Sequence, residues 1–434
     1  MTKTIGIRRE DKNKWERRVP LIPAHVGDLK ETHGIATIVQ SSDIRIFTDQ
    51  EYRTAGAEIR ENLSGAAVIF AVKEIPIHLL EEGKTYAFFS HTIKGQPYNM
   101  EMLKRLMDLN CNLVDYERMS DHGNARLITF SFYAGIAGMI ETLHAFGRKM
   151  ALQGHRTPFE NIKPAYQYNS EIEAREEIGK LGQEISQNGV PDALHPLTIG
   201  LSGYGNVSKG AQAILDLLPQ KTITPDQLRA GLNSTELDNT CLYKIVFKES
   251  DMVRPMDGEF ELQDYYSHPE KYQSRFDEYL PGLKILVNCV YWTEQYPRII
   301  SIESLGRLAA GVNPPALQVI GDISCDIKGS IEITRAATKP DNACYTYYAD
   351  GNAYKDGIHG SGITVMAIDN LPCEFPGEAS ASFSSELKRF VNAIVSADFG
   401  KDFDQLNLPD EIKKAVILHN GALTPNYQYM AAFI

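Results

Sequence analysis

The stretch "PLTIGLSGYGNVSKGAQAILDLL", residues 196–218, passes from an apolar run through a glycine turn into a helical segment. This order predicts a strand, a tight turn at Gly203 and Gly205, and a helix. In that setting the two glycines let the backbone approach a pyrophosphate at the helix N-terminus. Ser208 stands where the fingerprint has its third glycine, so a plain strand-to-helix turn is the alternative. The position of the turn at the head of an α/β unit favours dinucleotide binding.

The first 130 residues alternate strand-like and helix-like segments. Strands that are apolar on both faces and alternate with helices are typical of a parallel sheet. A long helical segment then leaves this sheet, and the residues after "GDISCD" are expected to return to it. We therefore predict an α/β protein with two doubly wound domains and an interdomain cleft. The expected domains are 1–135 completed by the C-terminal segment 325–434, and a dinucleotide-binding domain over 136–324.

The composition is that of an ordinary two-domain protein, with 434 residues, 43% hydrophobic and 23% charged. A net charge of −12 argues against nucleic acid or an anionic membrane as a partner. Six scattered cysteines predict neither a disulfide framework nor a metal site, and the N-terminus lacks the apolar core of a signal peptide. We expect a cytoplasmic protein that acts on small molecules, and a homo-oligomer is compatible with this sequence.

Charged residues follow apolar runs at four places in the first 130 residues, namely 15–23, 71–76, 90–96 and 115–130. If these runs are neighbouring parallel strands, their charged ends meet at the carboxyl edge of one sheet, where α/β sheets bind ligands. Lys73 directly follows a buried run, so burial should depress its pKa unless Glu74 or Glu117 compensates. His91 ends the next run and belongs to the residue type that titrates near neutrality.

Each of these residues also has an ordinary structural interpretation, as a solvated lysine, a core histidine or an arginine that caps a helix. Four such places at consecutive strand ends favour a shared site. The pattern predicts a Lys/His/Arg cleft suited to a carboxylate substrate and to proton transfer.

Five stretches carry a resemblance to a known family: "REDKNKWERRVPLIP", "TYAFFSHTIKGQ", "FYAGIAGMIETLHAFG", "GYGNVSKGAQAI" and "AIDNLP". They resemble the lysine-2-oxoglutarate reductase half of the bifunctional aminoadipic semialdehyde synthases of animals and plants. More distantly they are similar to the fungal saccharopine dehydrogenases (lysine-forming) and the alanine dehydrogenases. The saccharopine dehydrogenase half does not follow in this sequence. The resemblance therefore implies a stand-alone reductase that joins L-lysine and 2-oxoglutarate to saccharopine with NAD(P)H, or runs the reverse reaction.

The resemblance also implies two Rossmann-like domains and assigns roles to individual residues. The implied proton-transfer residues are Lys73, whose pKa would be tuned by burial and Glu117, and His91. The implied substrate contacts are Arg18, Lys94, Gln96, Glu117, Arg126 and Phe130. The implied cofactor contacts are Ser202, Gly203, Tyr204, Gly205, Asn206, Val207, Asn288, Val290, Asp322 and Ser324.

The cofactor is expected to be NADP, with NAD remaining open. An NAD site usually carries an acid about 20 residues after the glycine turn, at the end of the next strand. Here that strand is expected to end at Thr224, with Asp226 arriving late and Lys221 and Arg229 on either side. Two alternatives also remain: another amino-acid dehydrogenase of the alanine dehydrogenase type, and a non-catalytic nucleotide-binding relative.

Overall fold

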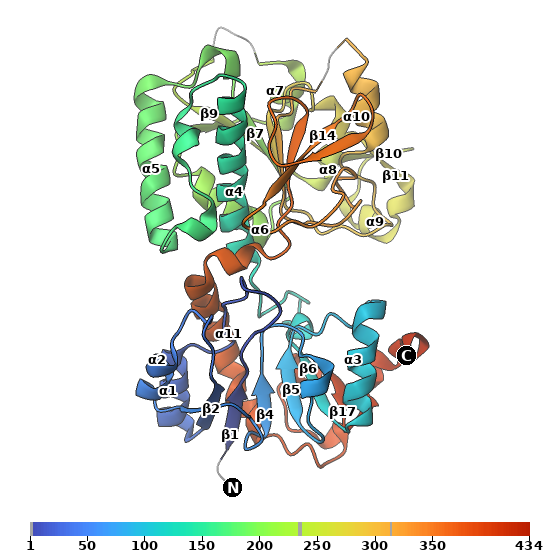
Figure 1. Ribbon diagram of the computed structural model, residues 1–434. Coiled ribbons are helices and arrows are strands. Elements are labelled where there is room, and N and C mark those ends of the chain that lie inside the picture. Colours follow the sequence, from blue (N-terminus) through green and yellow to red (C-terminus); the bar gives the residue numbers. More distant parts are fainter. Residues whose placement is uncertain (1–2, 233–236, 313–314) are drawn as a thin grey trace. The chain divides into compact units, whose positions relative to one another are not determined.

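The computed structural model describes residues 3–232, 237–312 and 315–434. The chain forms two compact units, Met1–Phe130 with Pro376–Ile434, and Ser131–Phe375 (Figure 1). Each unit contains a largely parallel sheet with helices, which confirms the predicted α/β class. The expected boundary at 324/325 is wrong, because residues 325–375 supply three strands that pair within the second sheet. The chain returns to the first unit only at Pro376.

The first unit is built on a sheet whose described strands have the order β18-β17-β6-β5-β4-β1-β2-β3. The strands from β6 to β3 are parallel, whereas β17 and β18 are antiparallel. From central β1 the chain adds strands first on one side and then on the other, so the winding reverses between β1 and β4. The strands are β1 (Thr4–Ile7), β2 (Ala36–Gln40), β3 (Glu58–Arg60), β4 (Val68–Phe70), β5 (Thr85–Phe88), β6 (Asn112–Asp115), β17 (Val416–His419) and β18 (Ala422–Leu423).

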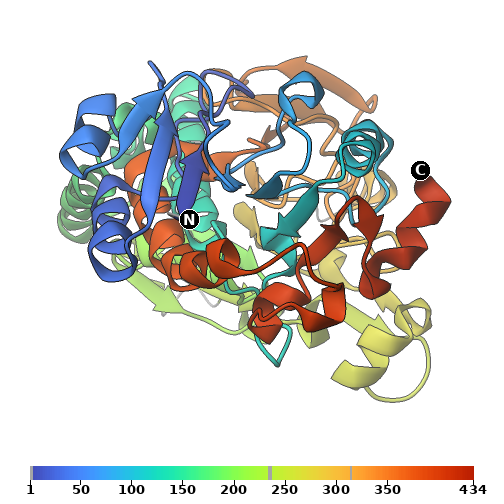
Figure 2. The ribbon, with the colours of Figure 1, turned by 90° about the horizontal axis from the view of Figure 1, so that it is seen from below.

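Helices connect these strands and cover the sheet. They are α1 (Pro23–His33), α2 (Asp49–Thr54), α3 (Pro97–Asp108), α11 (Pro376–Ser396) and α12 (Asp410–Lys413). Helix α1 begins with Pro23, where a missing N–H costs nothing, and ends at Gly34, whose φ of 64° suits a residue without Cβ. Helix α11 lies beside α1 (Figure 2), and right-handed crossovers place α3 on the opposite face. Residues 376–434 thus complete the first unit.

The second unit has a sheet whose described strands run in the order β15-β14-β16-β13-β12-β7-β9-β8. All neighbours are parallel except β14 and β15. Here the winding reverses between β7 and β12. The strands are β7 (Thr198–Ser202), β8 (Gln220–Thr222), β9 (Leu242–Phe247), β12 (Ile285–Asn288), β13 (Val319–Asp322), β14 (Cys344–Tyr348), β15 (Ala353–Asp356) and β16 (Ile363–Met366), with a separate ribbon of β10 (Val253–Pro255) and β11 (Tyr272–Ser274).

Two helices of this unit cross at unusually short distance. A Cβ placed on Gly135 of α4 would lie 1.9 Å from the Val207 oxygen, and one on Gly210 of α6 would lie 1.9 Å from the Phe132 oxygen. Gly135 and Gly210 therefore let the backbones of these two helices approach each other closely. The helices are α4 (Ser131–Leu152), α5 (Glu171–Asn188), α6 (Asn206–Leu215), α7 (Pro225–Ala230), α8 (Glu249–Met252), α9 (Leu262–Ser267) and α10 (Ile302–Ala309).

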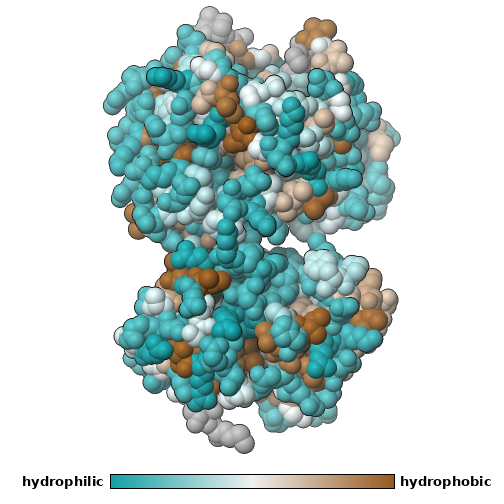
Figure 3. Space-filling model, viewed as in Figure 1, coloured by the Kyte–Doolittle hydropathy of each residue, from teal (hydrophilic) through white to brown (hydrophobic). Residues whose placement is uncertain are grey.

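The surface seen in Figure 3 is mainly hydrophilic, with hydrophobic residues in small separate groups. Among the described residues, none of the helices combines the length and the apolar character that crossing a membrane requires.

Candidate active site

At the reversal point of the first sheet, a buried carboxyl group joins the segments that follow β1 and β4. Glu10 follows β1, and its oxygens accept hydrogen bonds from the backbone N–H groups of Val72, at 2.6 Å, and Lys73, at 3.0 Å. Burial and the nearby Glu16 raise the pKa of Glu10 to about 7, against the lowering effect of the two amides. Glu10 thereby fixes the backbone of Lys73 beside β1, at the place where open α/β sheets bind ligands.

Both positive and negative side chains act on the amine of Lys73. Burial and then Arg18 lower the pKa of its amine, while Glu16 and Glu74 oppose that shift. None of the ion pairs among the described residues includes Lys73. Glu117, which was expected to tune Lys73, is not among the groups that act most on its pKa, and Oε1 of Glu117 accepts from Nη2 of Arg126 at 2.5 Å. Lys73 is therefore an amine whose pKa is below that of an ordinary lysine.

His91 follows β5 and is oriented by a carboxylate from the segment that follows the neighbouring strand β4. Its Nδ1 lies 2.5 Å from Oε1 of Glu74. Burial acts to raise the pKa of Glu74, but the bond and charge of His91, together with Lys12, lower it to about 2. Because an ionised carboxylate only accepts hydrogen bonds, Nδ1 of His91 is the donor and Nε2 is left for other partners.

The backbone of His91 is held in an uncommon conformation. Its φ is 50°, and its carbonyl oxygen accepts from Nδ2 of Asn99 at 3.1 Å. The hydroxyls of the two residues that flank it, Ser90 and Thr92, lie 2.7 Å apart, and Ser90 also donates to Asp115 at the end of β6. A left-handed non-glycine residue persists only where its surroundings fix it, which is frequent at functional sites.

Arg18 is fully buried with its own counter-ion. Its guanidinium donates to the two oxygens of Glu16 at 2.8 and 2.6 Å, and it lies 4.1 Å above the ring of Phe130. Phe130 in turn stacks on Phe383 of α11, with ring centroids 4.5 Å apart. The structure thus brings the predicted pair Arg18 and Phe130 together. Phe383 comes from the distant segment that completes this unit.

The other predicted substrate contacts of this unit differ in exposure. The Arg126 side chain is 48% exposed although it is paired with Glu117, and Lys94 is exposed. Oε1 of Gln96 is buried, and within the described part of the chain it has no hydrogen-bond partner. The side-chain oxygen of Gln96 is therefore a hydrogen-bond acceptor to which none of the described residues donates.

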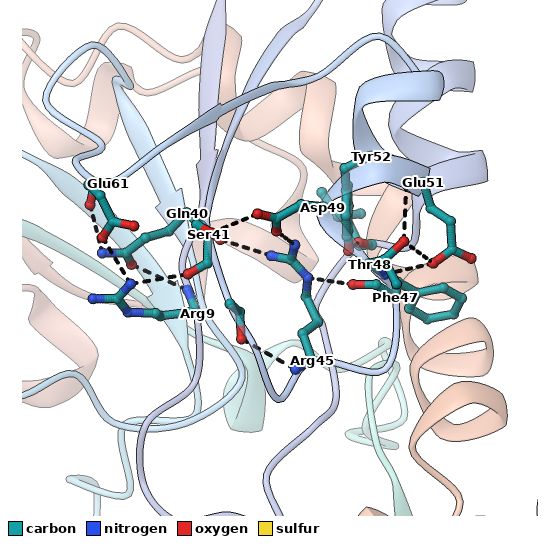
Figure 4. Close-up of polar contacts among 12 residues, drawn as sticks. Arg9, Gln40, Ser41, Arg45, Phe47, Thr48, Asp49, Glu51, Tyr52 and Glu61 are labelled. Carbon is teal, nitrogen blue, oxygen red and sulfur yellow. Dashed lines mark hydrogen bonds and ion pairs between the residues drawn. The ribbon is translucent and has the colours of Figure 1, made fainter.

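A second network keeps the loop after β2 in place (Figure 4). Buried Arg45 donates to the carbonyl oxygens of Gln40, at 2.9 Å, and Phe47, at 2.7 Å. Nε of Arg17 donates to the oxygen of Ile44 at 3.0 Å, which ties this loop to the segment that carries Arg18. The loop after β2 is therefore fixed by its own hydrogen bonds and supports the segment that carries Arg18.

The glycine turn of the second unit forms at the end of β7, as predicted. Gly203 has φ 87°, and its N–H donates to the Phe247 oxygen at 2.9 Å. A Cβ on Gly203 would lie 3.2 Å from Cγ1 of Val290, which follows β12. Tyr204, Gly205 and Asn206 are exposed at the N-terminus of α6. The turn thus leaves backbone accessible at a helix N-terminus, the arrangement that suits a phosphate group.

Three residues implied as cofactor contacts, Ser202, Asn288 and Asp322, are buried at the ends of their strands. Ser202 donates to Oδ1 of Asn288 at 2.8 Å, and Asn288 donates to Oδ1 of Asp322 at 2.8 Å. Burial raises the pKa of Asp322 to about 6, although its hydrogen bonds, Thr334 first, act to lower it. These side chains bond the ends of β7, β12 and β13 to one another. Ser324 likewise donates to the Val290 oxygen at 2.6 Å.

The strand beside β7 is not the one that the sequence indicated. After α6 the chain forms β8 at the sheet edge and only then β9, which pairs directly with β7. Lys221 is paired with Asp238 at 3.2 Å, and Arg229 with Asp226 at 2.8 Å. The residues near Thr224 that were expected at the ribose therefore follow β8, which β9 separates from β7 and the turn.

The end of β9 carries a different pair of charged residues. Glu249 accepts from Oη of Tyr266 at 2.8 Å. The charge of Glu249, followed by burial and a hydrogen bond with Glu249, raises the pKa of Tyr204. The ammonium of exposed Lys248 has no side-chain partner among the described residues. Lys248 therefore places an exposed positive charge next to the glycine turn, in sequence beside the carboxylate of Glu249.

Comparison with known proteins agrees with this architecture. Residues 6–137 match the family described as alanine dehydrogenase/PNT, N-terminal domain. The chain is 35% identical to the mitochondrial alpha-aminoadipic semialdehyde synthase of Mus musculus and 37% identical to the alpha-aminoadipic semialdehyde synthase of Arabidopsis thaliana. A saccharopine dehydrogenase [NAD(+), L-lysine-forming] of Yarrowia lipolytica is 24% identical, over 87% of this chain and 89% of its own length. These similarities support the alanine dehydrogenase/saccharopine dehydrogenase superfamily.

The match to the two synthases covers 98% of this chain but only 47% and 41% of theirs, so the chain spans about half their length. Two solved structures share the fold. An L-alanine dehydrogenase has a TM-score of 0.63 at 17% identity, covering 99% of both chains. A transhydrogenase from Sinorhizobium meliloti has a TM-score of 0.57 at 16% identity, covering 97% of this chain and all of its own.

Proposed function

We propose that this chain is an NADP(H)-dependent oxidoreductase that joins L-lysine and 2-oxoglutarate to saccharopine, or runs the reverse reaction. The observation that carries the proposal is the placement of Lys73 and the His91–Glu74 pair at neighbouring strand ends, beside the reversal point of the first sheet. The names of the relatives support the choice of substrates.

Lys73 is the proposed base for the amine substrate. The ε-ammonium group of lysine must lose a proton before its nitrogen attacks the keto carbon of 2-oxoglutarate. A lysine side chain is normally too basic for this task at neutral pH, but burial and Arg18 lower the pKa of Lys73. The attack gives a carbinolamine, with a new C–N bond and a hydroxyl group on the former keto carbon.

His91 is the proposed acid for the loss of that hydroxyl group. Its Nδ1 is occupied by Glu74, so Nε2 is the nitrogen that delivers the proton as water leaves and the imine forms. A bound nicotinamide supplies the hydride that reduces the imine carbon. Glu74 stabilises the protonated imidazole and fixes its orientation, the role of the third member in triad-like sites.

Arg18 and Arg126 are the proposed anchors for the substrate carboxylates, of which saccharopine has three. Each already faces a glutamate, Glu16 or Glu117. A guanidinium has five N–H donors, so it bonds a second carboxylate without leaving the first. Phe130 supplies the apolar surface beneath Arg18.

The glycine turn and Lys248 support the proposed cofactor. The exposed backbone of residues 204–206 at the start of α6 fits a dinucleotide pyrophosphate. The end of the strand adjacent to the turn is where the adenosine ribose is recognised in such folds. Lys248 places a positive charge there, and Glu249 is engaged by tyrosine hydroxyls. This charge favours the 2′-phosphate of NADP(H).

A spectrophotometric assay tests the proposal. NADPH oxidation is followed with lysine plus 2-oxoglutarate, and each component is omitted in turn. We expect oxidation only when both substrates are present. Oxidation with ammonia and pyruvate in their place would instead identify an amino-acid dehydrogenase of the alanine dehydrogenase type.

A further inference from the structure

The loop between β5 and α3 carries three of the proposed site residues, His91, Lys94 and Gln96. Its first half is fixed from inside the unit, through the hydrogen bond from Asn99 to the His91 oxygen. Its second half turns at Gly95, which has φ 65° and donates its N–H to the Thr92 oxygen at 2.9 Å. Such a turn by itself fixes neither Lys94 nor Gln96 relative to His91.

The 3₁₀ segment η10 (Pro425–Phe433) packs against this second half of the loop. Oη of Tyr429 donates to the carbonyl oxygen of Ile93 at 2.7 Å. The ring of Phe433 covers Gly95 so closely that a Cβ there would lie 2.6 Å from its Cγ. The chain end marked C accordingly lies beside α3 in Figures 1 and 2. Tyr429 and Phe433 thus hold the two residues on either side of Lys94.

The segment η10 is itself firmly attached to the sheet. Tyr427 is buried, and its Oη donates to the Lys414 oxygen at 2.7 Å. Oη of Tyr427 also accepts from Nε of Arg118 at 3.1 Å. Arg118 ends the 3₁₀ turn after β6. The residue before it, Glu117, pairs with Arg126. One segment therefore contacts both strand-end loops that supply the proposed substrate residues.

We infer that η10 positions the substrate-binding loop, with Tyr429 and Phe433 as positioning residues that hold Lys94 and Gln96 in place. The inference deepens the proposed function and rests on it only for the identity of the substrate. Misplacing a binding loop by about 1 Å is enough to cost up to 10²-fold in rate. The hydroxyl of Tyr429 and the ring of Phe433 act on the loop without contact with the reacting atoms.

Two variants and one control test this inference. Tyr429→Phe removes only the hydroxyl group, and Phe433→Ala removes the ring. Tyr98→Phe is the matched control, because Tyr98 lies just after the loop and is 72% exposed. We expect kcat/KM with lysine and 2-oxoglutarate to fall roughly 10-fold in each test variant, mainly through KM. NADPH affinity and Tm should stay near those of the control, and Phe433→Leu should recover part of the loss.

Hydrogen–deuterium exchange supplies a measurement that needs no substrate. The amides of residues 92–96 should exchange faster in Tyr429→Phe and Phe433→Ala than in Tyr98→Phe. If the wild type is inactive with lysine and 2-oxoglutarate but exchange rises as expected, the proposed substrates fail and the role of η10 stands. Unchanged exchange in both test variants would overturn the inference, as would a lower Tm with KM unchanged.

Discussion

Nδ1 of His91 lies 2.5 Å from Oε1 of Glu74, and this contact joins the residues that follow β5 and β4. The carboxylate is held ionised, since His91 and Lys12 outweigh burial and lower its pKa to about 2. Glu74→Gln keeps the shape but replaces the carboxylate that accepts from Nδ1 with a neutral amide. We expect kcat to fall roughly 10-fold, because the charged hydrogen bond that orients the ring becomes a weaker neutral one. An unchanged kcat, measured by steady-state kinetics, would remove Glu74 from the mechanism.

Loss of either proposed proton-transfer residue should slow the reaction strongly. We expect His91→Gln and Lys73→Met each to lower kcat by roughly 10²–10⁴-fold, the usual contribution of a positioned acid or base. Lys30→Met is a control, because Lys30 lies on α1 and donates to the Gly56 oxygen. Near-normal kcat in both variants, determined by steady-state kinetics, would place the proton chemistry elsewhere.

The two proposed arginine anchors should differ in their effect on stability. Arg126→Ala should raise KM for 2-oxoglutarate with little change in Tm, because the side chain is 48% exposed. Arg18→Ala should also destabilise the protein, by about 3–5 kcal/mol, because it leaves buried Glu16 without its counter-ion. Kinetics and thermal unfolding of both variants check this. Loss of NADPH binding in either variant, measured by calorimetry, would instead assign that arginine to the cofactor.

Cofactor preference should depend on Lys248. We expect Lys248→Ala to lower kcat/KM for NADPH on the order of 10-fold, with little effect on NADH, because a charged hydrogen bond to the 2′-phosphate is lost. Lys180→Ala on α5 is an exposed control. If Lys221→Ala produced the loss and Lys248→Ala did not, the phosphate would lie at β8 after all.

A buried carboxyl pair in the second unit predicts a pH dependence of stability. Glu141 and Glu374 face each other, and burial raises the pKa of both, that of Glu141 to about 7. The folded state therefore binds more protons than the unfolded state above the ordinary pKa of 4.5. Their contribution to stability is complete at lower pH and is lost as pH rises through about 7. Urea unfolding at pH 5, 7 and 9 should show this decline, and Glu374→Gln should reduce it. A stability that rises over this range would contradict the assignment.

The parts of the fold that follow local rules were predictable from the sequence. The turn at Gly203, the strand ends at Lys73 and His91, and the parallel sheets depend on residues close together in the chain. The order of β8 and β9 was not predictable, because it depends on which of the two strands pairs with β7 and which occupies the edge of the sheet. Residues 325–375 were misplaced for the same reason, since only the pairing of β16 with β13 assigns them to the second unit.

The ion-pair partners in the candidate site could not be predicted from the sequence for a related reason. Glu117 and Glu74 are both close to Lys73 in the expected layout, and only the structure pairs Glu117 with Arg126. Glu10 and Phe383 lie far from Lys73 and Phe130 in sequence, so no local pattern indicates their contacts. The buried positions of Ser202, Asn288 and Asp322 depend likewise on three strands meeting at one edge.

Product analysis tests the central claim most directly. The chain is incubated with NADPH, 2-oxoglutarate and lysine that carries a heavy-isotope label in its carbon skeleton, and the products are analysed by mass spectrometry. We predict one product, a secondary amine with the mass of saccharopine, that contains the labelled lysine skeleton joined to the 2-oxoglutarate skeleton. Formation of glutamate from added ammonia, with the labelled lysine unchanged, would contradict the account.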